Sequence, residues 1–433
     1  MPISLNDSSR RRTISILATA VLFAFILLWA GCEDQYRPVA IPIPLPGGDP
    51  QATHYAIVVN SNGGQPQNPG NPTGNPPVPA GPPPSVTQID VSGDTNIGNH
   101  PSGINPVHAV MSPGFGLVYI VNQGDNTLSA YSPLSGVGAT ISTIPLLQNN
   151  NEPNAGASYV AASTALAFVV ETTLNRLVVI DGSNLQAEAF VPVGVNPVAV
   201  VCTSDGRKAY VTNQGSSTVS VISTKDNTNQ QNIPVGASPG PVTISDDNNY
   251  VFVANEGDGT VSVIDTNSDM VTNTLTVGNT PTQLVWDPGL KRVYALNRGS
   301  GSVTIIDASA FPQKVLTTVP TSPTPVAVAP LDNGTKFYVL FLGTPGTVEV
   351  YDAQGYFKRT TITVGNNTLP TGLPALNQVL LSASPGSTKV YAVNYNGDAL
   401  NTAGSTSIIR TLDDTVDINM PSAAPNPTFV TSQ

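Results

Sequence analysis

The chain has 433 residues, only 10% of them charged, and its 17 basic and 28 acidic side chains give a net charge of -11. Such an acidic chain lacks the basic footprint that phosphate binding requires, which excludes nucleic acid as an expected partner. Gly (38) and Pro (40) are abundant and no helical periodicity follows residue 31, so the composition predicts an all-β protein.

The N-terminus carries the pattern of an export signal. Arginines at 10–12 precede a 17-residue apolar run at 14–30, which ends in Ala30-Gly31-Cys32. Residues 1–31 thereby resemble a bacterial lipoprotein signal peptide, which implies a lipid on Cys32 as the first residue of the mature chain. An uncleaved anchor is the alternative, because 17 apolar residues are at the lower edge of what can span a bilayer. We therefore expect an exported protein of the cell envelope, anchored to the membrane through Cys32 on the periplasmic side or at the cell surface.

Two proline-rich segments without an apolar face flank the first strand-like run. Residues 32–53 are interpreted as a tether, and residues 61–84 as a solvated surface insertion. Between them, residues 54–60 are rich in β-branched side chains and predict a strand. The folded domain is expected to cover residues 54–433, with the insertion at 61–84.

From residue 85 onward the chain repeats itself, and the period predicts its architecture. Each unit has short β-branched runs separated by Asn, Gly, Asp and Pro, which is typical of a four-stranded antiparallel propeller blade. The second run of each unit ends at a landmark residue, and successive landmarks are 49, 42, 42, 42, 44 and 53 residues apart. These landmarks are Asn122, Glu171, Asn213, Asn255, Asn297, Phe341 and Asn394. Asn60 precedes them as the landmark of a further unit, which makes eight units.

One unit carries specific family information. Residues 209–213 read Ala-Tyr-Val-Thr-Asn and residues 217–222 read Ser-Thr-Val-Ser-Val-Ile. This pattern closely resembles the YVTN β-propeller repeat family of secreted and surface proteins of bacteria and archaea. The resemblance extends over most of residues 54–433 and implies a propeller fold, but it implies no activity, because structural strands and not a catalytic motif define the family.

The chain end predicts how the ring closes. Residues 426–431 match the start of an inner strand, but the strands that should follow are missing. Residues 54–60 and 85–90 match a second and a third strand that lack an inner one. We therefore predict a closed ring of eight blades, one of them combining N- and C-terminal strands, with seven blades as the alternative if residues 54–60 lie outside it.

The turn residues that recur in each repeat are interpreted as structural. A binding site is therefore expected where equivalent positions of the repeats differ. The Asn and Asp that end strands should cap turns by bonding neighbouring amides. The position after each landmark varies between blades and should lie at the rim of the central channel. The candidate ligand-binding residues there are Gln123, Gln214, Glu256, Arg298 and Tyr395. Glu256 and Arg298 in adjacent blades could instead form a surface ion pair.

Searches for catalytic and metal chemistry identify no candidate. His54, His100 and His108 lack ligand spacing, so no metal and no cofactor are expected, although His108 on an inner strand could face the channel. Cys202 has no intramolecular partner if Cys32 is lipidated, and its apolar strand predicts an inert buried thiol.

Two functions therefore compete. The first is a binding or scaffold module of the cell envelope that is not an enzyme and takes a protein or small-molecule ligand at the channel rim. The second is a lactonase-like hydrolase, an activity known among related propellers, whose site would require carboxylates and a His at the channel mouth. A redox protein with a quinone cofactor finds little support, because the expected mature chain has a single Trp, Trp286.

Overall fold

The computed structural model describes residues 54–60, 84–113, 116–135, 141–147, 155–366, 380–395, 404–421 and 427–432. The expected signal peptide and tether, and the insertion up to residue 83, lie outside the described residues. In the described part, strands dominate and helix is confined to two single turns, η2 (Pro133–Ser135) and η4 (Pro385–Ser387). No helix in these ranges has the length and apolarity needed to cross a membrane.

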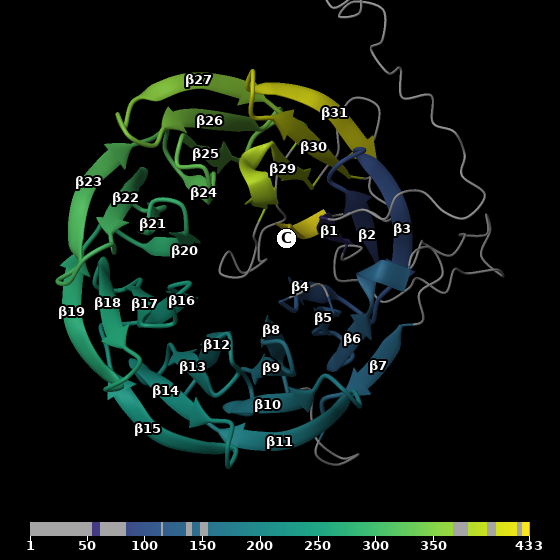
Figure 1. The fold of residues 1–433 in the computed structure, drawn as a ribbon, viewed down its shortest axis with the longest axis vertical. Coiled ribbons are helices and arrows are strands. Elements are labelled where there is room, and N and C mark those ends of the chain that lie inside the picture. The colour runs from purple at the N-terminus through teal and green to yellow at the C-terminus, as the bar shows by residue number, and fades with distance from the viewer. Residues whose placement is uncertain are drawn as a thin grey trace, which may run out of the picture. The chain divides into compact units, whose positions relative to one another are not determined.

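The strands form eight four-stranded antiparallel sheets, arranged as the blades of a closed β-propeller (Figure 1). The eight-bladed all-β prediction is confirmed, and the seven-bladed alternative is wrong. In each blade that comes from continuous chain, the first strand is innermost and the fourth is outermost (Figure 1).

Seven blades come from continuous chain. The first four of them are β4 (Pro106–Met111), β5 (Val118–Asn122), β6 (Thr127–Tyr131) and β7 (Ser142–Pro145); β8 (Ala157–Ala162), β9 (Leu166–Glu171), β10 (Arg176–Asp181) and β11 (Gln186–Pro192); β12 (Pro197–Cys202), β13 (Lys208–Asn213), β14 (Thr218–Ser223) and β15 (Thr228–Pro234); and β16 (Pro239–Ile244), β17 (Tyr250–Asn255), β18 (Thr260–Asp265) and β19 (Met270–Thr276).

Three further blades follow the same order along the chain. They are β20 (Pro281–Asp287), β21 (Arg292–Asn297), β22 (Ser302–Asp307) and β23 (Lys314–Pro320); β24 (Pro325–Pro330), β25 (Lys336–Phe341), β26 (Thr347–Asp352) and β27 (Lys358–Thr363); and β28 (Leu381–Ala383), β29 (Lys389–Asn394), β30 (Ser405–Arg410) and β31 (Thr415–Pro421).

The eighth blade closes the ring with strands from both ends of the chain, as predicted, and is called the composite blade below. Its inner strand is β32 (Pro427–Ser432), which pairs with β1 (Tyr55–Asn60), and β2 (Ser85–Asp90) and β3 (Thr95–Pro101) complete it. The antiparallel register of β1 and β32 joins Ala56 to Ser432 and Val58 to Val430. Apolar side chains of this blade pack against both neighbouring blades, so the ring has no break between its first and last continuous blades.

The landmark asparagines have a different role from the one expected. Asn213 lies within β13, where its Nδ2 donates to Thr218 Oγ1 (3.1 Å) and Ser220 Oγ (2.9 Å) on the next strand. The same two bonds to Ser or Thr recur at Asn122, Asn255, Asn297 and Asn394. These amides therefore connect the second strand to the third and do not cap a turn, because their buried Oδ1 atoms accept no backbone N–H.

The aspartates that end the third strands do cap turns, as expected. Asp181 Oδ1 accepts the backbone N–H of Ser183 at 2.8 Å, and the equivalent bond in the next repeats runs from Asn267 to Asp265 at 2.9 Å. The carboxylate occupies the tip of a tight connection to the outer strand, where it satisfies an amide that has no ladder partner.

Polar side chains also connect one blade to the next. Lys336 on β25 pairs with Asp414 at 2.8 Å, and Asp414 lies in the β30–β31 connection of the following blade. Lys389 on β29 likewise pairs with Asp94 at 2.5 Å and donates to the carbonyl of Val91 at 2.7 Å. The last contact joins the C-terminal blade to the composite blade, so side chains as well as strand pairing close the ring.

Candidate functional site

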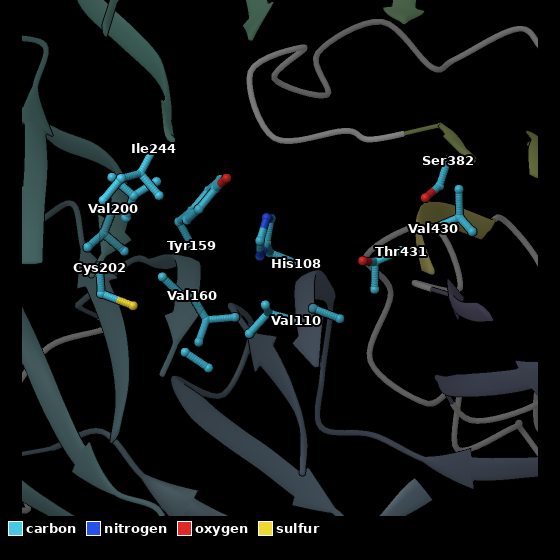
Figure 2. Close-up of a pocket in the computed structure, with 14 residues that line it drawn as sticks. His108, Val110, Tyr159, Val160, Val200, Cys202, Ile244, Ser382, Val430 and Thr431 are labelled. Carbon is cyan, nitrogen blue, oxygen red and sulfur yellow. The ribbon is translucent and has the colours of Figure 1, made fainter. Parts of the chain in front are cut away.

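A cavity of about 330 Å³ lies between the innermost strands, at the centre of the ring (Figure 2). Strands β4, β8, β12, β16, β28 and β32 line it, so six of the eight blades contribute. Each inner strand starts beside the landmark of its own blade, as the pairing of Pro197 with Asn213 shows. The lining residues come from the middle and far end of these strands, for example Cys202 and Ile244. The cavity therefore extends from the middle of the channel to the end away from the landmarks.

A pair of aromatic rings marks one side of this cavity. His108 on β4 and Tyr159 on β8 have ring centroids 3.8 Å apart and planes tilted by 31° (Figure 2). Burial lowers the pKa of His108 to about 3, because the charged imidazolium would lose its hydration. Burial also raises the pKa of Tyr159 to about 12. Both rings are therefore uncharged at neutral pH and present flat aromatic surface with polar atoms at its edge.

The rest of the wall is aliphatic with a few hydroxyl groups. Val160, Val200 and Ile244 lie near the Tyr159 side, and the hydroxyls of Ser382 and Thr431 lie on the far side of His108 (Figure 2). All the residues that line this cavity are uncharged at neutral pH. Such a wall favours a small, mostly apolar ligand whose orientation a few polar atoms determine.

Cys202 lies in the wall as a thiol of low reactivity. It is a free, buried cysteine on β12, as the sequence predicted. Burial, with a smaller effect of Asp205, raises the pKa of the thiol to about 12. Since the thiolate is the reactive form, Cys202 contributes packing surface to the cavity and not a nucleophile.

The rim residues expected from the sequence lie elsewhere, at the opposite half of the channel. The backbone N–H of Gln214 donates to the carbonyl of Asn196, just before the inner strand of the same blade, at 2.9 Å. Gln123, Glu256 and Arg298 make the same backbone bond, with lengths of 3.0 to 3.1 Å. Tyr395 is 3% exposed. None of the five lines the cavity, so their role in ligand binding stays a prediction that concerns a separate surface.

The side chains of the two glutamines are held within their own blades. Gln214 Oε1 accepts from Asn196 Nδ2 at 3.1 Å, and Gln123 Oε1 accepts from Asn105 Nδ2 at 3.3 Å. Glu256 and Arg298 form no ion pair within 4.0 Å in the described part of the chain, so the expected surface ion pair is wrong. The glutamines are thus fixed in orientation, while Arg298 extends into partly exposed space.

Glu256 is the one carboxyl of this group with an unusual environment. Its Oε1 is buried without a hydrogen-bond partner and lies against Gly240 of β16, where any larger residue would collide with it. Burial raises the pKa of Glu256 to about 7. A carboxyl that titrates near neutral pH can exchange a proton with a bound molecule, which is the property of a general acid or base.

The sequence reasoning missed the cavity because it looked for variation at the rim only. His108 and Tyr159 occupy the same register position, since each pairs with the residue before its landmark. That position holds Ala199, Gln283 and Ala327 in other blades. The same test for variation, applied to the inner strands, would have identified both aromatic residues. The approach of His108 to the channel was the correct part of the expectation.

Comparison with known proteins supports the propeller fold and assigns no activity. No family model and no curated protein matches the chain. The dihydro-heme d1 dehydrogenase NirN, solved in complex with DHE, is 15% identical over 89% of this chain and 75% of that one, with a TM-score of 0.64. Apo AztD from Citrobacter koseri is 10% identical over 88% and 98%, with a TM-score of 0.59. Hydrazine synthase from Kuenenia stuttgartiensis is 19% identical over 71% and 95%, with a TM-score of 0.53.

At identities below 25% these similarities indicate a shared fold and not a shared activity. The chain is therefore an eight-bladed β-propeller with distant neighbours among propeller proteins of different functions.

Proposed function

We propose that the protein is an exported, lipid-anchored propeller of the cell envelope, which binds a small, mostly apolar ligand in its central channel. The observation that carries the proposal is the cavity of about 330 Å³ with the tilted ring pair of His108 and Tyr159 in an otherwise aliphatic wall. This volume is at the lower end of the range of roughly 300–1,000 Å³ that small-molecule sites occupy. The wall offers apolar surface and a few hydroxyls, which suits the binding of a small ligand.

The lipid anchor rests on the N-terminal sequence. Arginines at 10–12, the apolar run at 14–30 and Ala30-Gly31-Cys32 support export and lipidation of Cys32. Replacing Cys32 by Ser should move the protein from the membrane fraction to the soluble fraction. Unchanged membrane attachment would instead support an uncleaved anchor.

A ligand screen by thermal shift on residues 54–433 tests the cavity. A ligand that binds only the folded state raises the midpoint of unfolding. Val110→Phe should abolish the shift, because Val110 is half-buried and lines the cavity. Val107→Phe is the matched control, since Val107 is half-buried on the same strand but lies outside the lining. A shift that survives Val110→Phe and disappears on Gln214→Ala would move the site to the rim.

A hydrolase is the second candidate, and the environment of Glu256 is the observation that favours it. A carboxyl with a pKa of about 7 could serve as general base at the channel rim. In the described ranges no three His, Cys, Asp or Glu side chains converge as a metal site would require, so the hydrolase would depend on Glu256 as its base. Turnover of lactone or ester substrates that Glu256→Gln abolishes would support the hydrolase. Turnover that the variant leaves unchanged would remove Glu256 from consideration.

A further inference from the structure

Exposed apolar side chains gather in one kind of connection. In the described ranges seven large apolar side chains are exposed, and five of them lie in, or directly after, the connection between the third and fourth strand of a blade. The five, with their exposed fractions, are Leu134 (49%), Met270 (63%), Phe311 (62%), Phe357 (57%) and Leu412 (93%). Single exposed apolar residues are ordinary, but repetition at one structural position in five blades is not.

These connections all lie on the same face of the propeller. Because successive strands of a blade are antiparallel, the third-to-fourth connections lie on the face opposite the landmarks. The four blades that end in β19, β23, β27 and β31 are neighbours in the ring, and the composite blade with β3 comes next (Figure 1). Leu134 belongs to the blade beyond it. The five residues, here named the apolar arc, therefore surround the composite blade on both sides.

The chain also enters the propeller on this face. The carbonyl of His54 accepts the N–H of Val91 at 3.2 Å, and Val91 begins the β2–β3 connection. The 21 residues from 33 to 53 span roughly 25 Å as a coil and up to about 65 Å when extended. A lipid on Cys32 would thus hold a bilayer within a few nanometres of the apolar arc.

We infer that the apolar arc is a membrane-contacting surface that places this face of the propeller against the lipid bilayer; the inference rests on the proposed lipid anchor. A bilayer fits the arrangement better than a protein partner does. The arc consists of separate tips, one in each of five blades, and not of the contiguous apolar patch that a stable protein interface buries. Isolated apolar tips can each enter the boundary between head groups and acyl chains.

The anchor explains why shallow insertion would be sufficient. Tethering converts contact with the surface into an intramolecular event at high effective concentration, so weak individual contacts determine the orientation. Lys314 and Arg359 lie close to Phe311 and Phe357 in sequence, are 70% and 42% exposed, and pair with Asp307 at 3.9 Å and with Asp352 at 3.4 Å, so that cations and carboxylates alternate around the apolar tips. Their charges can remain at the level of the head groups while the rings enter the membrane.

The test uses the full chain, reconstituted into phosphatidylcholine vesicles and labelled with an environment-sensitive fluorophore on a single introduced cysteine. The labelled positions are Phe357→Cys and Leu412→Cys in the apolar arc, and Val195→Cys as the matched control. Val195 is 56% exposed but precedes an inner strand, on the landmark face. We expect a blue shift and quenching by bilayer-embedded quenchers at positions 357 and 412, and neither at position 195.

The outcomes separate the surface from the anchor. If the protein stays on the vesicles but all three labels respond alike, the membrane-contacting surface is wrong and the anchor stands. If the chain does not remain on the vesicles, the anchor fails and the surface proposal fails with it. If labels 357 and 412 are shielded without lipid and the mass doubles, the arc is an interface between two copies, which also overturns the proposal.

Discussion

Deleting residues 427–433 would remove the strand that closes the ring, and we expect it to unfold the composite blade. β32 joins β1 through five paired positions. Each ladder hydrogen bond contributes about 1 kcal/mol, and burial of a valine such as Val430, which is 0% exposed, contributes about 1.5 kcal/mol or more. The total of roughly 5 kcal/mol or more is comparable with the whole stability of many domains.

Calorimetry and hydrogen exchange measure the effect separately. The deletion should lower the unfolding temperature and remove protection from the β1 amides, because β1 becomes an exposed edge. Val430→Ala deletes two carbon atoms and should cost about 2 kcal/mol. Ile418→Ala on the outer strand β31, where Ile418 is 43% exposed, is the control with little expected effect. If the deletion leaves the unfolding temperature and the β1 protection unchanged, the reasoning about closure is refuted.

Three further predictions concern buried polar groups. Lys336→Met should lower the free energy of unfolding by about 3 kcal/mol in urea titrations, because it leaves Asp414 partly buried without its cation, and adding Asp414→Leu should restore part of the loss. Between pH 7 and pH 5 the stability of the protein should fall by about 2 kcal/mol relative to that of His108→Leu, because burial holds the pKa of folded His108 near 3 while the unfolded state binds the extra proton near its pKa of about 6.5; the opposite slope from the raised pKa of Glu256 is common to both proteins and cancels in this difference. Asn213→Ala should cost about 2 kcal/mol by denaturant titration, since it removes two buried hydrogen bonds, and a loss below about 0.5 kcal/mol would argue against the structural role of the amide.

The fold was predictable because propeller information is local and repeated. The period of 42 residues between Asn213, Asn255 and Asn297 defines one blade, and each blade forms its ladders between strands adjacent in sequence. Even the long-range pairing of β1 with β32 followed from the same pattern, because the two ends supplied complementary parts of one repeat unit.

The role of the landmark asparagines was not predictable from residue preferences alone. Asn is common in turns, but Asn213 lies in a buried strand where only hydroxyls on the next strand can satisfy its Nδ2. The relevant signal is a second pattern, the Ser or Thr five and seven residues after Asn, which the bonds to Thr218 and Ser220 reveal. Tertiary context determined the partner, whereas a residue preference describes only local backbone.

The position of the cavity was not predictable for a related reason. A side chain such as Tyr159 is apolar enough to be assigned to the core, and only the packing of adjacent blades places it against His108 in the channel. The rim assignment used loops, which carry function in many folds, but loops in this propeller hold Gln214 and Gln123 by bonds within their own blades. Variation between equivalent inner-strand positions is the information that the sequence did contain.

The cavity and the apolar arc lie toward the same face, and this constrains how a ligand would reach the site. Cys202 and Ile244 belong to the ends of inner strands that point away from the landmarks, and Phe311 and Phe357 lie on that face at its periphery. If the arc contacts a bilayer, the end of the channel nearer the cavity faces lipid, where an apolar ligand is concentrated by partition. A charged ligand would have to cross the opposite half of the channel and leave its hydration shell among aliphatic side chains. With the apolar arc on a bilayer, this geometry would favour a lipophilic ligand supplied from the membrane over a polar one supplied from bulk water.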